Sequence, residues 1–224
     1  MKLAPLLPAF GAPPAEASLR DTAAHGPSHT FRSESTMGFA KKAVLCFLLD
    51  RSVEKVAGST FRGRQASRLA NLLSGFGGRP IMGVLALGYL AASGPARRSY
   101  GTAFEAAGEA MLITDSLKFV IGRMRPGESG SDPDEFRGLG SGYGSFPSGH
   151  TSNAFALATV LAKEHPKHKW LYYALATGVG LARVQQHEHF LSDVFVGAAI
   201  GTYAGNQAIK GRTLFGKQRR LHGK

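Results

Sequence analysis

From about residue 39 onward, apolar segments of helical length alternate with short polar joints. This pattern is typical of a helical bundle, whereas the period-two alternation that indicates half-buried strands is absent from the sequence. We therefore predict an all-α fold, a bundle of about six helices, from seven candidate segments: 39–57, 66–75, 79–93, 100–122, 150–164, 169–184 and 190–209.

The polar joints and the ends of the chain suggest its domain organisation. The longest joint, 127–146, is dense in Gly, Ser and Asp and predicts a surface loop, which at this length is usually functional or mobile. Residues 1–36 are rich in Pro, Ala, Ser and Thr without periodicity, so we predict a disordered leader there. The rest is predicted to be one domain over 37–210 with a basic C-terminal tail over 211–224.

The leader is open to two further interpretations. Its apolar stretch 3–10 and the small residues around Ala15 and Ala17 resemble a signal peptide, although prolines within and just after the stretch oppose this. Met37 also fits a true start, because Lys41 and Lys42 follow it just ahead of an apolar run.

Two patterns bear on a membrane in opposite directions. The best apolar runs, such as 194–209, have about 15 to 16 residues, while a full span needs about 20. Basic residues nevertheless mark alternate joints, which the positive-inside rule places together on the cytoplasmic side: 41–42, 97–98, 163–169 and 210–224. We therefore expect a membrane-embedded bundle whose joints near 123–149 and 184–190 face the non-cytoplasmic side, with a periplasmic protein as the alternative.

Composition and charge narrow the classes of partner and site. The chain has 224 residues, enough for one domain with a sizeable core, and its net charge of +12 favours an anionic partner. Nucleic acid, anionic lipid headgroups and phosphorylated substrates all meet that description. Because Cys46 is the only cysteine, an intrachain disulfide and a cysteine metal cluster are excluded.

Three polar clusters fall on the joints expected to face outward, and the first runs from Lys118 to Pro126. Lys118 and Arg125 are seven residues apart, so a continuous helix would place them on one face, with Pro126 ending that helix. Two cations on one face repel each other unless an anion lies between them. The plainer interpretation is a solvated basic face or a cytoplasmic anchor.

The second cluster, from Phe146 to Thr151, directly precedes an apolar segment. Backbone N–H groups at a helix start are unpaired and bind anions readily. The Ser148 hydroxyl and the Gly149 N–H could therefore donate to phosphate oxygens. Ordinary N-capping by Ser148 is the alternative interpretation.

The third cluster runs from Arg183 to Asp193. His189 and Asp193 are one helical turn apart, so the carboxylate can accept from one ring nitrogen and leave the other as a nucleophile. Arg183, at the end of the preceding helix, can fork onto a phosphate. Two alternatives remain: a metal site from His187, His189 and Asp193, whose spacing lacks a settled geometry, and a structural ion pair.

Together, the clusters supply cations, a helix N-terminus, two histidines and a carboxylate, which is the inventory that phosphoryl transfer needs. Their patterns, Lys-x6-Arg-Pro, Pro-Ser-Gly-His and Arg-x5-His-x3-Asp, resemble the type 2 phosphatidic acid phosphatase (PAP2) superfamily, which also includes bacterial acid phosphatases and vanadium haloperoxidases. The match spans about 76 residues. It departs at Ala182, where the third motif usually has Ser, so we expect the missing hydroxyl to tune activity rather than abolish it.

The resemblance implies a phosphatase that works through a phospho-histidine intermediate, without a metal or an organic cofactor. It implies that His189 attacks phosphorus, that Asp193 orients His189 and stabilises its charge, and that His150 protonates the leaving alkoxide and then activates water. The phosphate oxygens would be held by five residues: Lys118, Arg125, Ser148, Gly149 and Arg183.

Within the family, the substrate is open between a lipid phosphate and a small phosphomonoester, as in soluble periplasmic acid phosphatases. Phosphatidic acid, phosphatidylglycerophosphate and isoprenyl pyrophosphates are all candidate lipids. The apolar, small-residue helices after the second and third motifs resemble the membrane lipid enzymes, as at Ala199, Gly201, Ala204 and Gly205. We therefore expect a membrane and a phosphorylated substrate as partners, and no nucleic acid; no pattern indicates an oligomeric state.

Two hypotheses lie outside this phosphatase interpretation. A vanadium haloperoxidase would hold vanadate in the same anion site, although such enzymes resemble longer, soluble chains. A non-enzymatic binder of membranes or nucleic acid would use a basic, roughly helical stretch but would leave both histidines and Asp193 unexplained. That stretch contains Arg51, Lys55, Arg62, Arg64 and Arg68.

Overall fold

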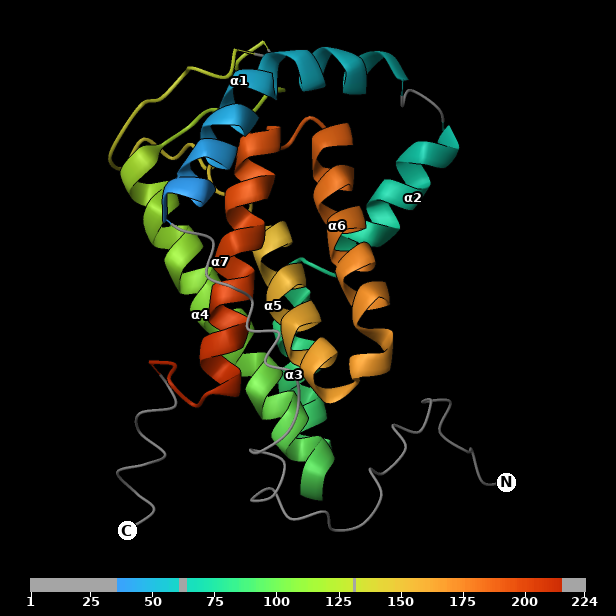
Figure 1. Cartoon of the computed structure of the whole chain (residues 1–224). Helices are drawn as coiled ribbons and strands as arrows, with labels where there is room; N and C mark the ends of the chain where they lie inside the picture. Colours follow the sequence, from blue (N-terminus) through green and yellow to red (C-terminus); the bar gives the residue numbers. More distant parts are fainter. Residues whose placement is uncertain (1–35, 61–63, 131, 215–224) are drawn as a thin grey trace.

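The computed structural model describes residues 36–60, 64–130 and 132–214. The predicted leader, apart from Thr36, and the tail beyond residue 214 lie outside the described residues. Over the described ranges the protein is all-α, with seven α-helices, one short 3₁₀ turn and no strand (Figure 1). The predicted fold class is therefore confirmed, with seven helices in place of about six.

Each predicted segment corresponds to one helix. In chain order they are α1 (Thr36–Thr60), α2 (Arg64–Gly75), α3 (Pro80–Ala91), α4 (Gly94–Ile121), α5 (Gly149–Glu164), α6 (Lys169–Gln185) and α7 (Leu191–Ile209), with the 3₁₀ turn η1 (Pro166–His168) between α5 and α6.

The largest difference from prediction is the start of α4, which begins six residues early. Ser93 has an extended backbone and Pro95 occupies the first turn of the helix. Proline is well suited to that position, because the first N–H groups of a helix have no intrahelical partner.

Helix α5 is the centre of the bundle, and α4, α6 and α7 pack against it, while α1 packs on α7 and α2 on α6 (Figure 1). A stripe of glycines on α7 allows the closest of these contacts. A Cβ atom at Gly201 would lie 2.1 Å from the carbonyl oxygen of Ser152, and one at Gly197 would lie 2.5 Å from that of Ser148. Because α7 approaches the start of α5 so closely, the second and third sequence clusters meet: the Ser148 N–H donates to the carbonyl of Asp193 over 3.0 Å.

The outer surfaces of the helices carry many large apolar side chains. Leu48 and Trp170 are each 74% exposed, and Leu72 and Leu87 are each 69% exposed. None of the described helices combines the length and the hydropathy of a membrane-crossing segment.

Candidate active site

The ends of α4 and α6 and the starts of α5 and α7 lie at the same end of the bundle, the upper end in Figure 1. The loop segments 122–130 and 132–148 lie at the upper left of this end in Figure 1, and the second half of α1 runs across it. All eight residues proposed from the sequence as a site lie on these four helix ends or in the joints next to them. The chain therefore gathers the three sequence clusters at one end of the bundle.

Lys118 and Arg125 do not share one helix face, so that prediction is wrong. Helix α4 stops at Ile121, because Gly122 adopts the left-handed conformation with a φ of 57° and donates its N–H to the Lys118 carbonyl. Pro126 therefore lies beyond the helix instead of ending it. A Cβ at Gly122 would also lie 2.3 Å from the Gly138 carbonyl oxygen, so both the turn and the packing favour glycine.

Lys118 links the first cluster to the second. Its ammonium donates to the carbonyl of Gly144, which lies in the loop just before α5. Cβ atoms built at Gly144 and Gly149 would lie 3.5 Å and 3.9 Å from the Lys118 side chain. Lys118 thus lies directly beside the start of α5, where a bound anion would accept from backbone N–H groups.

The predicted anion site at the start of α5 depends on which hydrogen bonds Ser148 makes. Ser148 is the N-cap residue, but among the described residues its side chain makes no capping hydrogen bond. Its hydroxyl oxygen instead accepts from the Thr151 hydroxyl at 2.9 Å, so the Ser148 proton remains for another acceptor. Ordinary side-chain capping by Ser148 is therefore wrong as an explanation of this cluster.

His189 lies in the joint before α7, and Asp193 is in the first turn of that helix. His189 Nδ1 is 3.6 Å from Asp193 Oδ2, which is close enough for electrostatic contact but too long for a hydrogen bond. Nδ1 has no hydrogen-bond partner among the described residues. The carboxylate therefore faces Nδ1 of the ring and leaves Nε2 for other chemistry.

The Asp193 carboxylate is held by contacts that the sequence did not indicate. Its Oδ2 accepts from the Ser145 hydroxyl at 2.5 Å and from the Phe190 N–H at 2.9 Å. Its Oδ1 accepts from the Arg123 guanidinium at 2.6 Å. Burial raises the pKa of Asp193, but His189 and Arg123 outweigh it, so the pKa lies below its ordinary value.

Arg123 also lies at this end of the bundle, and the sequence did not single it out. It is fully buried, and its guanidinium contacts both Asp193 and Asp50 of α1, the latter over 2.8 Å. Asp50 also accepts from the N–H and the hydroxyl of Ser192, at 2.8 and 2.6 Å. Little in the sequence indicated this role for Arg123. Arg123 resembles one more cation in a basic cluster, and its partner Asp50 is distant along the chain.

Arg125 and Arg183 meet around Glu188, to which the sequence assigned no role. Glu188 Oε2 forms ion pairs with both guanidinium groups, at 3.2 Å for Arg183 Nη2. Arg183 also donates to the side-chain oxygen of Gln186 over 2.6 Å. Its Nε is buried and finds no hydrogen-bond partner among the described residues.

Burial and neighbouring cations lower several pKa values at this end. Burial, opposed by Asp193, lowers the pKa of His189 to about 4. Burial together with Arg183 lowers the pKa of His150 to about 4 as well. Burial also lowers the pKa of Lys118 to about 8 and, with Arg125, that of Arg183 to about 10. The imidazoles are therefore neutral near pH 7, and the surroundings favour an added anion.

The metal-site alternative for the third cluster has no matching geometry. The His187 side chain contacts Glu54 of α1, and His187 itself has a φ of 57°. Over the described residues, no three His, Cys, Asp or Glu side chains are arranged to hold a metal ion.

In the basic stretch of α1 and α2, Arg51 forms an ion pair with Asp132 over 3.2 Å.

A family model described as the PAP2 superfamily matches residues 99–213, which is about half of the chain and includes all three clusters. Two lipid A 1-phosphatases are 32% identical to this chain: one from Porphyromonas gingivalis over 42% of this chain and 22% of the relative, and one from Rhizobium johnstonii over 41% and 39%. A probable lipid phosphate phosphatase of Arabidopsis thaliana is 31% identical over 42% of this chain and 41% of its own length. The matched region thus spans about two fifths or less of these curated relatives.

Two solved structures have the same fold. The crystal structure of Aquifex aeolicus LpxE has a TM-score of 0.59 and 24% identity, and the match covers 72% of this chain and 95% of that chain. The crystal structure of a transmembrane PAP2-type phosphatidylglycerolphosphate phosphatase from Bacillus subtilis has a TM-score of 0.56 and 21% identity, with 78% and 94% covered. At these identities the likeness concerns the fold alone.

Proposed function

The chain belongs to the PAP2 superfamily, and on this basis we propose that it hydrolyses the phosphate monoester of a lipid through a phospho-histidine intermediate. The observation that carries the proposal is the meeting of the three sequence clusters at one end of the bundle. There His189 is buried beside Asp193. Lys118, Arg125 and Arg183 all lie close enough to His150, in the first turn of α5, to lower its pKa.

In the first step, His189 Nε2 attacks phosphorus. A bond forms between Nε2 and phosphorus as the bond from phosphorus to the ester oxygen breaks, and His150 donates a proton to the departing oxygen. Asp193 faces Nδ1 and stabilises the positive charge that the ring acquires. Lys118, Arg125, Arg183, Ser148 and the N–H of Gly149 hold the three remaining phosphate oxygens.

In the second step, water attacks the phospho-histidine. His150, now neutral, accepts a proton from the water, and the bond between phosphorus and Nε2 breaks to release inorganic phosphate. This cycle needs a protonated His150 at its start, although burial and neighbouring cations lower its pKa to about 4. The two negative charges of a bound phosphate ester offset those cations and raise the pKa again, so substrate binding itself charges the acid.

Three observations favour a lipid over a small soluble ester. The curated relatives that share the matched region include two lipid A 1-phosphatases and a probable lipid phosphate phosphatase. Large apolar side chains are exposed over most helices, a surface typical of contact with a membrane. We therefore propose a membrane-associated enzyme with its site on the non-cytoplasmic side, as the basic joints indicate.

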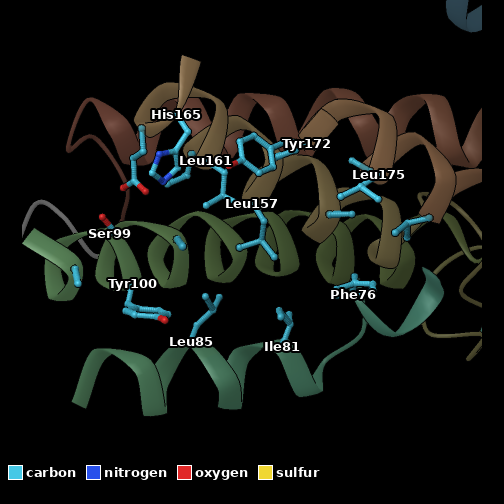
Figure 2. Close-up of a pocket in the computed structure, with 18 of the residues that line it drawn as sticks. Phe76, Ile81, Leu85, Ser99, Tyr100, Leu157, Leu161, His165, Tyr172 and Leu175 are labelled. Atoms are coloured by element: carbon cyan, nitrogen blue, oxygen red, sulfur yellow. The ribbon is translucent and has the colours of Figure 1, made fainter. Parts of the chain in front are cut away.

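The third observation is an apolar cavity of about 930 Å³ between α3 and α4 on one side and α5 and α6 on the other (Figure 2). Ala154, Ala158 and Leu161 line it, and all three lie on the face of α5 that also carries His150. The acid donates to the leaving group, so the leaving alcohol lies on the His150 side. Most of the lining is apolar, as with Leu85, Tyr100, Leu157, Tyr172 and Leu175.

The length of the cavity matches a hydrocarbon chain. Its lining on α5 runs from Ala154 to Glu164, which corresponds to about 15 Å of helix at 1.5 Å per residue. One leaflet of a bilayer is about as deep, since the hydrocarbon core measures about 30 Å across. We propose that one chain of the leaving lipid alcohol lies in this cavity.

The test is phosphate release in detergent micelles, with EDTA present, from phosphatidic acids of decreasing chain length and from p-nitrophenyl phosphate. We expect activity on the long-chain lipid, a progressive fall in kcat/KM as the chains shorten, and the lowest value for the small ester. His189→Ala should lose activity by at least about 10⁴-fold, the scale on which removal of a nucleophile acts.

A matched control is His168→Ala, which removes an exposed imidazole at the opposite end of the bundle and should leave activity unchanged. Trapping of acid-labile phosphate on the wild-type chain, and its absence from His189→Ala, would identify the intermediate. Equal kcat/KM for the small ester and the long-chain lipid would favour a non-specific acid phosphatase. Activity abolished by EDTA would contradict the metal-free mechanism.

A further inference from the structure

Glu188 lies where the phosphate of a substrate is expected. Its carboxylate oxygen Oε2 forms ion pairs with Arg125 and Arg183, the two guanidinium groups of the proposed phosphate site. Among the described residues it is the one carboxylate paired with both. Glu188 also directly precedes the nucleophile His189 in the chain, so its position is set by the same backbone.

The charges around it explain why a carboxylate lies there. Lys118, Arg125 and Arg183 repel one another, and burial and this repulsion lower the pKa values of Lys118 and Arg183. Buried or half-buried cations are costly unless an anion lies close to them. Glu188 supplies that anion from within the chain.

The fit of Glu188 is incomplete. Its Oε2 has ion-pair contacts but no hydrogen bond of good geometry among the described residues, and the buried Arg183 Nε has no hydrogen-bond partner there either. A carboxylate matched to an arginine normally accepts two parallel hydrogen bonds. A phosphate group offers more oxygens and more charge, so it can satisfy donors that Glu188 leaves unused.

The Glu188 side chain also has room to move away from the two arginines. Its exposed fraction is 33% and that of Arg125 is 38%, so this side of the site opens to solvent, while Arg183 at 11% lies deeper. The Glu188 backbone is held by its N–H, which donates to the Arg183 carbonyl over 3.1 Å. Rotation about the side-chain bonds can therefore carry the carboxylate outward without moving His189.

We propose that Glu188 is an internal competitor of phosphate: its carboxylate neutralises Arg125 and Arg183 until the phosphate of a substrate displaces it, and it returns as inorganic phosphate leaves. The proposal rests on the proposed function for its biological meaning, because it assigns Glu188 a part in substrate affinity and product release. Its physical content, competition between two anions for two arginines, is independent of whether the chain hydrolyses anything.

The test is equilibrium binding of inorganic phosphate, measured by calorimetry on the full chain in detergent, for wild type and Glu188→Gln. Glutamine keeps the size and removes the charge. We expect Glu188→Gln to bind phosphate about 10-fold more tightly, the lower end of what a hydrogen bond between charged groups contributes. In turnover assays the same variant should show stronger product inhibition by phosphate, because the competitor is gone.

Glu128→Gln is the matched control. Glu128 accepts from the backbone N–H of Arg125 over 3.3 Å, so it lies close to the site, but no ion pair joins it to a guanidinium group among the described residues. Its removal should change phosphate affinity by less than about twofold, as for an exposed charge. Glu188→Asp serves as a second variant should Gln not fold: its shorter side chain competes less, so it should bind phosphate more tightly than wild type.

Two results would overturn the proposal. Weaker phosphate binding in Glu188→Gln would mean that the carboxylate positions the arginines for phosphate instead of competing with it. Unchanged binding would mean that it lies outside the phosphate site. Tight phosphate binding without any hydrolysis would instead support the competitor and contradict the proposed function, so the two failures are distinguishable.

Discussion

One end of this bundle contains two groups of charged residues, one around Arg123 and one around Arg183. The two groups differ in burial and in how completely their charges are paired. Around Arg123, every charged partner is fully buried, and Arg123, Asp50, Asp193 and Ser192 are linked by hydrogen bonds of 2.6 to 2.8 Å. Around Arg183, the charges are partly exposed, and a buried donor finds no partner among the described residues.

This difference indicates that one group supports the folded structure and that the other can bind a ligand. A buried network whose members are all satisfied is rigid, and removing one member leaves others charged without a partner. A cluster with unused donors has room for a ligand and gains from one. We infer that the Arg123 network holds Asp193 beside His189, whereas the cluster of Lys118, Arg125 and Arg183 can bind a further anion.

The largest effect should follow from Arg123→Met. The substitution leaves Asp50 and Asp193 buried without their shared cation, which should lower the free energy of unfolding by about 3–5 kcal/mol. Denaturant unfolding in detergent measures it. Arg137→Met is the control, because Arg137 is exposed and, among the described residues, forms an ion pair only with nearby Glu135. Adding Asp50→Asn should restore part of the loss; a loss below about 1 kcal/mol would place Arg123 outside this supporting role.

A somewhat smaller effect, on catalysis rather than folding, should follow from Arg183→Met. We expect kcat/KM to fall by about 10²–10³-fold, the usual consequence of losing one donor to a transition-state oxyanion, with little change in unfolding. Arg97→Met, at the opposite end of α4 and stacked over Tyr89, is the control for kinetics. If Arg183→Met unfolded as readily as Arg123→Met, the distinction between the two groups would collapse.

The smallest effect should come from pH. The pKa of His189 is about 4 in the folded protein and 6.5 ordinarily, so between those values the unfolded chain binds more protons. The folded state therefore loses stability as pH falls through this range, by about 2 kcal/mol from His189 between pH 7 and pH 5. Unfolding measured at both pH values should show this loss, and His189→Asn should reduce it. A stability that stays flat in wild type would mean that burial does not hold the ring neutral.

The pattern of apolar segments was sufficient to predict the helices. Seven segments became seven helices, because burial of an apolar face decides where a helix forms over a dozen or more residues. The ends were less accurate: α4 was expected to carry Arg125 and ends at Ile121, because the left-handed Gly122 stops it. A glycine within an apolar run does not by itself indicate whether it lies inside a helix or caps one.

The spacing of polar residues was sufficient to find the residues that converge. His150, His189 and Arg183 were all assigned from short motifs, and the structure brings them to one end of the bundle. The catalytic roles assigned to them stay proposals. Glu188 and Arg123 were missed because a charged residue inside a motif carries no local sign of which partner it will meet.

The sequence by itself determined the helical class, the order of the helices and the residues that we propose for phosphate transfer. The helices depend on local periodicity, because burial of an apolar face follows that periodicity, and the chemistry depends on residue type. Only the tertiary structure decided which charges are supports and which are free to bind. That distinction depends on burial and on partners distant along the chain, such as Asp50 of α1, which pairs with Arg123 after α4. The strength of an interaction between charges is set by their surroundings and not by residue type alone.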